Sequence, residues 1–126
     1  MVPVNVFEYV DYRLFMKAFY EAKKKSPGTF SYRRFSKLAE NASPNFVKLV
    51  VDGQRNLTVL NIHKFALAMG LSPIEHDFFV ALVHFTQEED GDCQNYYRAR
   101  MLKIMRERER EPLQTSASGE TLVSRG

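Results

Sequence analysis

The fold of this chain is constrained most by a series of short segments in which apolar residues have the spacing of an α-helix. Strong helix-start and helix-stop signals separate these segments. Residues 72–75, Ser-Pro-Ile-Glu, form a capping box with a proline inserted and predict a helix that runs to about Thr86. The segment before it is predicted to begin after Thr58 and to end at Gly70. Because the other segments have the same spacing and no strand pattern is present, we expect an all-α fold.

The first long segment, residues 11–25, is predicted to be a helix capped by Asp11. Pro27 and Gly28 end it, because this pair cannot continue a helix. The apolar stripe expected to face the core comprises Leu14, Phe15, Ala18 and Phe19.

Two short helices are predicted next, over residues 32–41 and 44–52. Ser31 is the expected cap of the first, and Ser43 with Pro44 starts the second. Only a couple of residues, around Asn41 and Ala42, are expected to separate them. Two short helices joined by a tight turn are typical of the helix-turn-helix, whose second helix can lie in the DNA major groove.

Side chains on these two helices divide into apolar and polar sets. Residues expected in the core are Phe35, Leu38 and Ala39 on the first helix, and Phe46, Leu49 and Val50 on the second. Asn45, Lys48 and Asp52 are expected to point outward. Val47 and Val51 also look exposed, which would suit a protein groove better than a base edge.

The last helix is predicted over residues 93–111, with Tyr97, Met101, Ile104 and Met105 facing inward. A helical domain over residues 1–111 would then be followed by a disordered tail, 112–126, which is polar and without periodicity. The 126-residue length suits one domain.

Charge is distributed unevenly along the chain. Residues 12–64 hold eleven Lys and Arg against three Asp and Glu, whereas residues 65–92 hold six Asp and Glu and no Lys or Arg. A basic half followed by an acidic half predicts a directional electrostatic surface, although such charges can also simply cover solvated faces.

The sequence offers no catalytic or cofactor motif, so we do not expect an enzyme. No phosphate loop, nucleophile elbow or HExxH pattern is present, and His63, His76 and His84 lack metal-ligand spacing. We therefore predict no metal and no cofactor. A single Cys93, no apolar run long enough to span a membrane and no signal peptide favour a cytoplasmic protein.

The chain from Phe7 to about Phe85 resembles a known bacterial group. Residues 30–57, FSYRRFSKLAENASPNFVKLVVDGQRNL, look like a lambda-repressor/Cro-type helix-turn-helix. The wider match resembles the N-terminal part of a paralogous family known from Fibrobacter and from Bdellovibrio-like predators, whose members carry a further C-terminal domain of unknown function. Shared features include Phe7-x-Tyr9-x-Asp11-Tyr12-Arg13 and Asp52-Gly53-x-Arg55-Asn56-Leu57. This resemblance implies a five-helix lambda-repressor-like bundle, here followed by a sixth helix.

The resemblance also implies a set of DNA contacts. Phosphate contacts would fall at the start of the first short helix, on Ser31 and Tyr32. Base contacts would come from the start and outward face of the second helix, through Ser43, Asn45 and Lys48. The loop after it would contact the DNA backbone through Gln54, Arg55 and Asn56. Arg33, Arg34 and Lys37 join the phosphate set because their helix crosses the DNA backbone in this motif, although they can equally form a solvated face. This sequence departs from the family pattern at three positions, with Tyr32 for glutamine, Glu40 for the turn glycine, and Pro44 for a base-contacting side chain.

We therefore predict a DNA-binding helix-turn-helix protein that acts in transcription and has double-stranded DNA as its partner. The alternative is a protein-interaction module on the same scaffold. A homodimer through the C-terminal helix is compatible with either.

Overall fold

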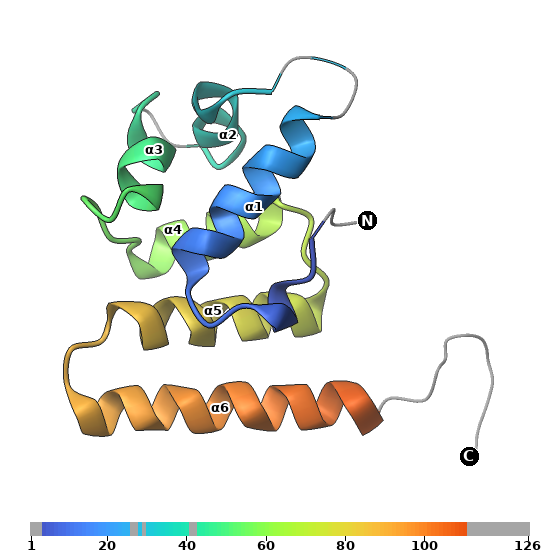
Figure 1. Ribbon diagram of the computed structural model, residues 1–126, viewed down its shortest axis with the longest axis vertical. Coiled ribbons are helices and arrows are strands. Elements are labelled where there is room, and N and C mark those ends of the chain that lie inside the picture. The colour runs from blue at the N-terminus through green and yellow to red at the C-terminus, as the bar shows by residue number, and fades with distance from the viewer. Residues whose placement is uncertain (1–3, 26–27, 29, 41–42, 111–126) are drawn as a thin grey trace.

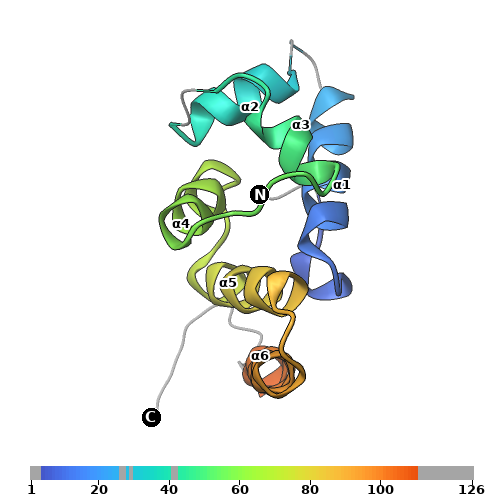
Figure 2. The same ribbon diagram turned by 90° about the vertical axis from the view of Figure 1, so that its left-hand side faces the viewer.

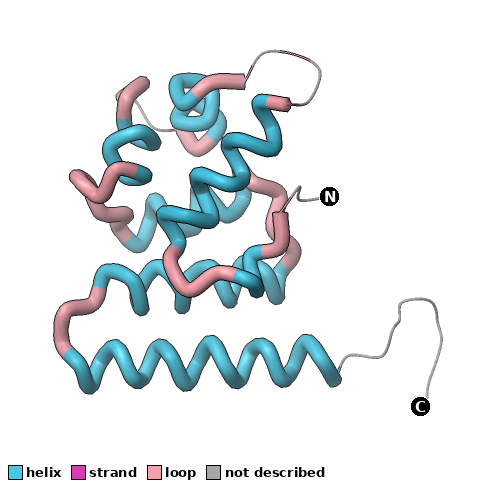
Figure 3. Tube along the Cα trace, viewed as in Figure 1, coloured by secondary structure: helices cyan, strands magenta, loops and turns pink. Residues whose placement is uncertain are grey.

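The computed structural model of the protein describes residues 4–25, 28, 30–40 and 43–110. Within these residues it contains helices and loops without a strand, which confirms the predicted all-α fold (Figure 3). In this part of the chain a short 3-10 helix precedes six α-helices, in the order η1 Val6–Glu8, α1 Tyr12–Lys24, α2 Tyr32–Leu38, α3 Phe46–Val51, α4 Val59–Ala68, α5 Pro73–Gln87 and α6 Gly91–Arg110. The predicted tail, 112–126, lies outside the described residues.

Helix α5 is central to the arrangement. It packs against α6 on one side and against α1 and α4 on the other, and it also contacts η1 (Figures 1 and 2). Helices α2 and α3 pack against each other beyond α1 and α4, so they form the end of the molecule furthest from α6 (Figures 1 and 2).

Local capping signals place α4 and α5 as predicted. The Thr58 hydroxyl accepts a hydrogen bond from the Asn61 N–H, and Gly70 after α4 has a φ of 72°. At the start of α5, the Ser72 side chain and the Glu75 side chain each accept from the other residue's backbone N–H, which completes the capping box.

The buried face of α1 differs from the predicted stripe. Asp11 caps the helix as expected, but Leu14 is 58% exposed, whereas Tyr12, Met16 and Tyr20 are buried with Phe15 and Phe19. The prediction for Leu14 was wrong because the true stripe follows residues 12, 15, 16, 19 and 20, and both tyrosines belong to it.

One cluster of buried side chains runs through all seven elements. Its largest fully buried members are Tyr12, Phe15, Phe35, Phe65, Phe78 and Phe79. In the described part of the chain, no helix has both the length and the apolar character that crossing a membrane requires.

Candidate nucleic-acid interface

Helix α2 presents basic side chains on the side opposite its buried face. Ser31 caps the helix as predicted, and its hydroxyl accepts a hydrogen bond from the Arg34 N–H at 3.1 Å. Phe35, Ser36 and Ala39 are buried, while Arg33, Arg34 and Lys37 are exposed. The prediction that Leu38 faces the core was wrong, because α2 ends there and the side chain is 51% exposed.

Tyr32, at the start of α2, is held by a stacking contact. Its ring lies parallel to that of Tyr20, with 3.9 Å between the centroids and 11° between the planes. Burial raises the pKa of the Tyr32 hydroxyl, and Tyr20 and Glu21 act in the same direction. The hydroxyl therefore stays a protonated hydrogen-bond donor well above neutral pH.

The connection between α2 and α3 is longer than predicted. Since α2 ends at Leu38 and α3 begins at Phe46, seven residues separate them, of which Asn41 and Ala42 lie outside the described set. Glu40 has a φ of 59°, the left-handed conformation that favours glycine. This is the position at which the resembled family carries glycine, and here the Glu40 carboxylate lies 3.5 Å from the Lys64 ammonium.

Helix α3 starts two residues later than predicted and is anchored by different side chains. Ser43 and Pro44 precede the helix, and the N-cap is Asn45, which makes no side-chain capping bond. Instead the buried Ser36 hydroxyl on α2 accepts a hydrogen bond from the Val47 N–H at 3.2 Å. That bond satisfies a backbone donor of the first turn of α3 and fixes α3 against α2.

The core contacts of α3 also required correction. Val47 is 0% exposed, as is Val50, whereas Leu49 is only half-buried. Val51 is half-buried and packs against the core. The sequence-based suggestion that Val47 and Val51 form an exposed apolar groove was therefore wrong. Phe46 is half-buried, with its ring stacked on Phe65 at 6.1 Å.

The outward side of α3 is polar, as predicted. Asn45, Lys48 and Asp52 are exposed, and so is Ser43 just before the helix. The Lys48 ammonium lies 3.2 Å from the Asp52 carboxylate, one turn away. An exposed pair of this kind contributes only about 0–1 kcal/mol, so another anion can replace Asp52 at little cost.

The loop after α3 is held in place by Arg13, a residue whose role the sequence analysis missed. The Arg13 guanidinium donates to the Val50 carbonyl at 2.6 Å, the Arg55 carbonyl at 2.8 Å and the Asn56 side-chain oxygen at 2.7 Å. Gly53, with a φ of 83°, lets the chain turn at the end of α3, and the Gln54 N–H bonds back to the Leu49 carbonyl.

These bonds therefore fix the backbone of the loop residues that are predicted to contact the DNA backbone. Gln54, Arg55 and Asn56 are all exposed, although the Asn56 side-chain oxygen is already engaged by Arg13.

Gln87, at the end of α5, fixes the far end of the loop. Its side chain accepts from the Leu57 N–H at 2.7 Å and donates to the Leu57 carbonyl at 3.1 Å, as a neighbouring strand would. The same side-chain oxygen accepts from the Tyr12 hydroxyl at 2.5 Å. Burial raises the pKa of Tyr12 to about 12, while the Arg13 charge opposes this shift.

The acidic part of the chain lies away from α2 and α3. Glu88, Glu89, Asp90 and Asp92 belong to the end of α5, its connection to α6 and the first turn of α6. Both views place that connection at the other end of the molecule from α2 and α3 (Figures 1 and 2). The exposed cations of α2 and α3 are thus well separated from these carboxylates.

Two of the three histidines meet, although they belong to different helices. His63 Nδ1 on α4 lies 2.8 Å from His76 Nε2 on α5. Burial lowers the pKa of His76, and His63 lowers it further. Among the described residues no third metal-ligating side chain joins this pair. His84 instead stacks on Tyr97 at 4.9 Å, so the predicted packing role of Tyr97 is confirmed.

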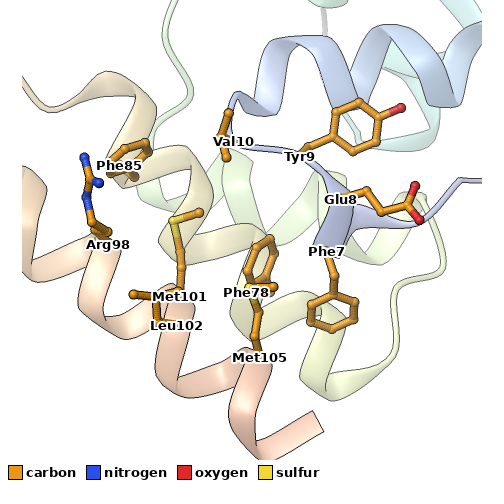
Figure 4. A pocket seen from close by; sticks show the side chains of 10 residues that line it. All are labelled: Phe7, Glu8, Tyr9, Val10, Phe78, Phe85, Arg98, Met101, Leu102 and Met105. Atoms are coloured by element: carbon orange, nitrogen blue, oxygen red, sulfur yellow. The ribbon is translucent and has the colours of Figure 1, made fainter. Parts of the chain in front are cut away.

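An apolar pocket of about 550 Å³ lies beside α5 and is lined in part by Phe78 and Phe85 of that helix (Figure 4). It opens between the η1 region, which contributes Phe7, Tyr9 and Val10, and α6, which contributes Met101 and Leu102.

We compared the chain with known protein families, with curated proteins and with solved structures, and found no match.

Proposed function

We propose that this protein binds duplex DNA through α2, α3 and the loop that follows α3, and that it acts as a transcription regulator. The observation that carries the proposal is the exposed polar and basic set at one end of the molecule. Arg33, Arg34 and Lys37 on α2 and Lys48 on α3 are exposed there, on helices that pack against each other. The resemblance to lambda-repressor-like helix-turn-helix domains supports the same assignment.

In this proposal the two helices have different tasks. Helix α2 lies across the phosphate backbone, with Ser31, Tyr32 and the basic side chains of α2 as its contacts, and so supplies affinity without sequence preference. Helix α3 enters the major groove, where Asn45 would pair with adenine and Lys48 with guanine, each good contact being worth about 1–3 kcal/mol. Ser43 lies beside them, and Gln54, Arg55 and Asn56 meet the DNA backbone.

Anchoring of α3 matters to this mechanism because base contacts demand a fixed helix. Six residues are too few to form a stable helix alone in water, so tertiary contacts must hold α3 in place. The bond from Val47 to Ser36 and the bonds from Arg13 hold its two ends.

A set of matched alanine variants tests the proposal. Lys48→Ala and Arg55→Ala are each expected to weaken binding to a mixed-sequence duplex about three- to tenfold in a fluorescence anisotropy titration, because each removes one phosphate or base contact. Arg100→Ala is the control, since it removes an exposed cation from α6, on the side of the molecule away from α2 and α3, at a position outside the residues that recur along the outer face of that helix. Equal effects of all three variants would refute the assigned surface.

A second candidate function is a protein-interaction module, and α4 rather than α3 now favours it. Leu60 and Leu67, two turns apart on α4, are 62% and 69% exposed, and Val59 beside them is 61% exposed. Several large apolar side chains exposed on one helix suit a protein partner. The double variant Leu60→Ser/Leu67→Ser separates the candidates: unchanged duplex affinity is expected if DNA binding resides on α2 and α3.

A further inference from the structure

Helix α6 leaves one face exposed along its whole length. Its inner face packs on α5, with Met101 and Ile104 buried, while residues recurring every three or four positions on the other side are exposed: Asp92, Asn95, Ala99, Lys103, Arg106 and Arg110. Two large apolar side chains flank this outer face, Tyr96 at 62% and Leu102 at 48% exposure.

Charge changes sign along the same helix. The four carboxylates of residues 88–92 lie at or before its first turn, whereas residues 98–110 hold six Arg and Lys against two Glu. A parallel copy would place like charges together. An antiparallel copy would place the basic half of each helix beside the acidic end of the other.

We propose that the outer face of α6 pairs antiparallel with α6 of a second copy of this chain, about a two-fold axis near Ala99. With that axis, each Asp92 lies opposite Arg106 of the partner, because the two positions are equally far from Ala99 on either side. The small Ala99 side chain lets the helices approach at the axis, and Tyr96 and Leu102 cover the contact on its two flanks.

The arrangement has a consequence for DNA. The α2 and α3 end is opposite α6 in the molecule, so a dimer joined through α6 points its two α2–α3 surfaces in opposite directions (Figures 1 and 2). Such a dimer would bridge two duplexes and would not span two half-sites of one duplex. This consequence rests on the proposed DNA binding, whereas the dimer itself does not.

Charge reversal tests the pairing in the full chain. The parent protein is expected to sediment as a dimer that dissociates on dilution, and Asp92→Arg or Arg106→Asp alone is expected to shift it to monomer at the same concentration. The double variant Asp92→Arg/Arg106→Asp is expected to dimerise again, because the opposite charges are restored. A parent that is monomeric throughout the concentration range, or a double variant no better than the single ones, would overturn the proposal. Equal helix content by circular dichroism confirms that the variants are folded.

Disulfide cross-linking tests the register independently. In a Cys93→Ser background, Ala99→Cys places two thiols at the axis and is expected to give a covalent dimer under mild oxidation. Lys103→Cys in the same background is the control, because a rise of 1.5 Å per residue separates its two copies by about 12 Å along the helices. Equal cross-linking of both variants, or none of Ala99→Cys, would overturn the antiparallel register.

The two proposals fail separately. A dimer that binds no duplex would refute the proposed function and leave the α6 pairing intact. Conversely, a monomer that binds duplex DNA would refute only the pairing. If both hold, complexes at saturation are expected to contain two duplexes per dimer by light scattering.

Discussion

Arg13 is the residue on which the candidate interface depends most heavily for its shape. Arg13 is half-buried, and its guanidinium donates hydrogen bonds to three oxygens at the end of α3 and in the following loop. It also lies over the Tyr12 ring, 4.9 Å from the centroid. Because these acceptors are 37 to 43 positions away in the sequence, no local pattern could assign this role to Arg13.

Tyr12 supplies a test of the buried contact beside Arg13. Its pKa rises from an ordinary value of 10.0 to about 12 on folding, so the folded state retains a proton that the unfolded state loses. The resulting stability is fully present below pH 10 and is lost as the pH rises toward 12. We expect the free energy of unfolding of the parent to fall through this range by about 2 kcal/mol more than that of Tyr12→Phe.

Urea denaturation at several pH values between 8 and 12, on the order of one pH unit apart, measures this difference. Tyr12→Phe is also expected to be less stable below pH 10, because it loses the hydrogen bond to Gln87. If the difference in the free energy of unfolding between the parent and Tyr12→Phe is the same at every pH, the raised pKa assigned to Tyr12 is contradicted.

At the scale of elements, sequence signals predicted best where a helix end is determined locally. Thr58, Gly70 and the box at residues 72–75 act on backbone groups within four positions, so the ends of α4 and α5 could be predicted from the sequence. Helix α3 was placed too early because Ser43 and Pro44 form a strong local start signal. Its actual start depends on Ser36, eleven positions before Val47, and a local pattern cannot include such a bond.

In the candidate site, too, local features could be predicted from the sequence, whereas contacts between helices could not. Its exposed basic residues on α2 and α3 followed from helical spacing, whereas the burial of Val47 depends on how α3 packs on α1 and α2. The stacking of Tyr32 on Tyr20 likewise joins two helices and leaves no signal in either segment.

Ser36 tests how α3 is fixed to α2. Ser36→Ala leaves the buried Val47 N–H without its acceptor, so we expect the free energy of unfolding to fall by about 1–3 kcal/mol in urea denaturation. Arg33→Ala, on the exposed side of the same helix, is the matched control and is expected to change it by less than about 0.5 kcal/mol. If the two variants have the same free energy of unfolding, the hydrogen bond between Ser36 and Val47 does not stabilise the fold.

At the scale of the whole molecule, the uneven charge of the sequence becomes a separation in space. The basic side chains of α2 and α3 occupy one end and the acidic connection between α5 and α6 the other (Figure 1). The consecutive helices α2 and α3 pack against each other, whereas α6 packs against α5 on the side away from them, so residues that are distant along the chain are also distant in space (Figure 1).

The salt dependence of duplex binding tests the central claim most directly. Each phosphate neutralised by a cation releases counterions, so the logarithm of the association constant should fall linearly with the logarithm of salt concentration, with a slope of about −0.9 per contact. If Arg33, Arg34, Lys37 and Arg55 each neutralise a phosphate, we expect a slope of about −3.6, reduced in magnitude by about 0.9 in Arg55→Ala and unchanged in Lys48→Ala, whose side chain meets a base. A flat salt response, or no binding at low salt, would contradict the proposal that this end of the molecule binds DNA.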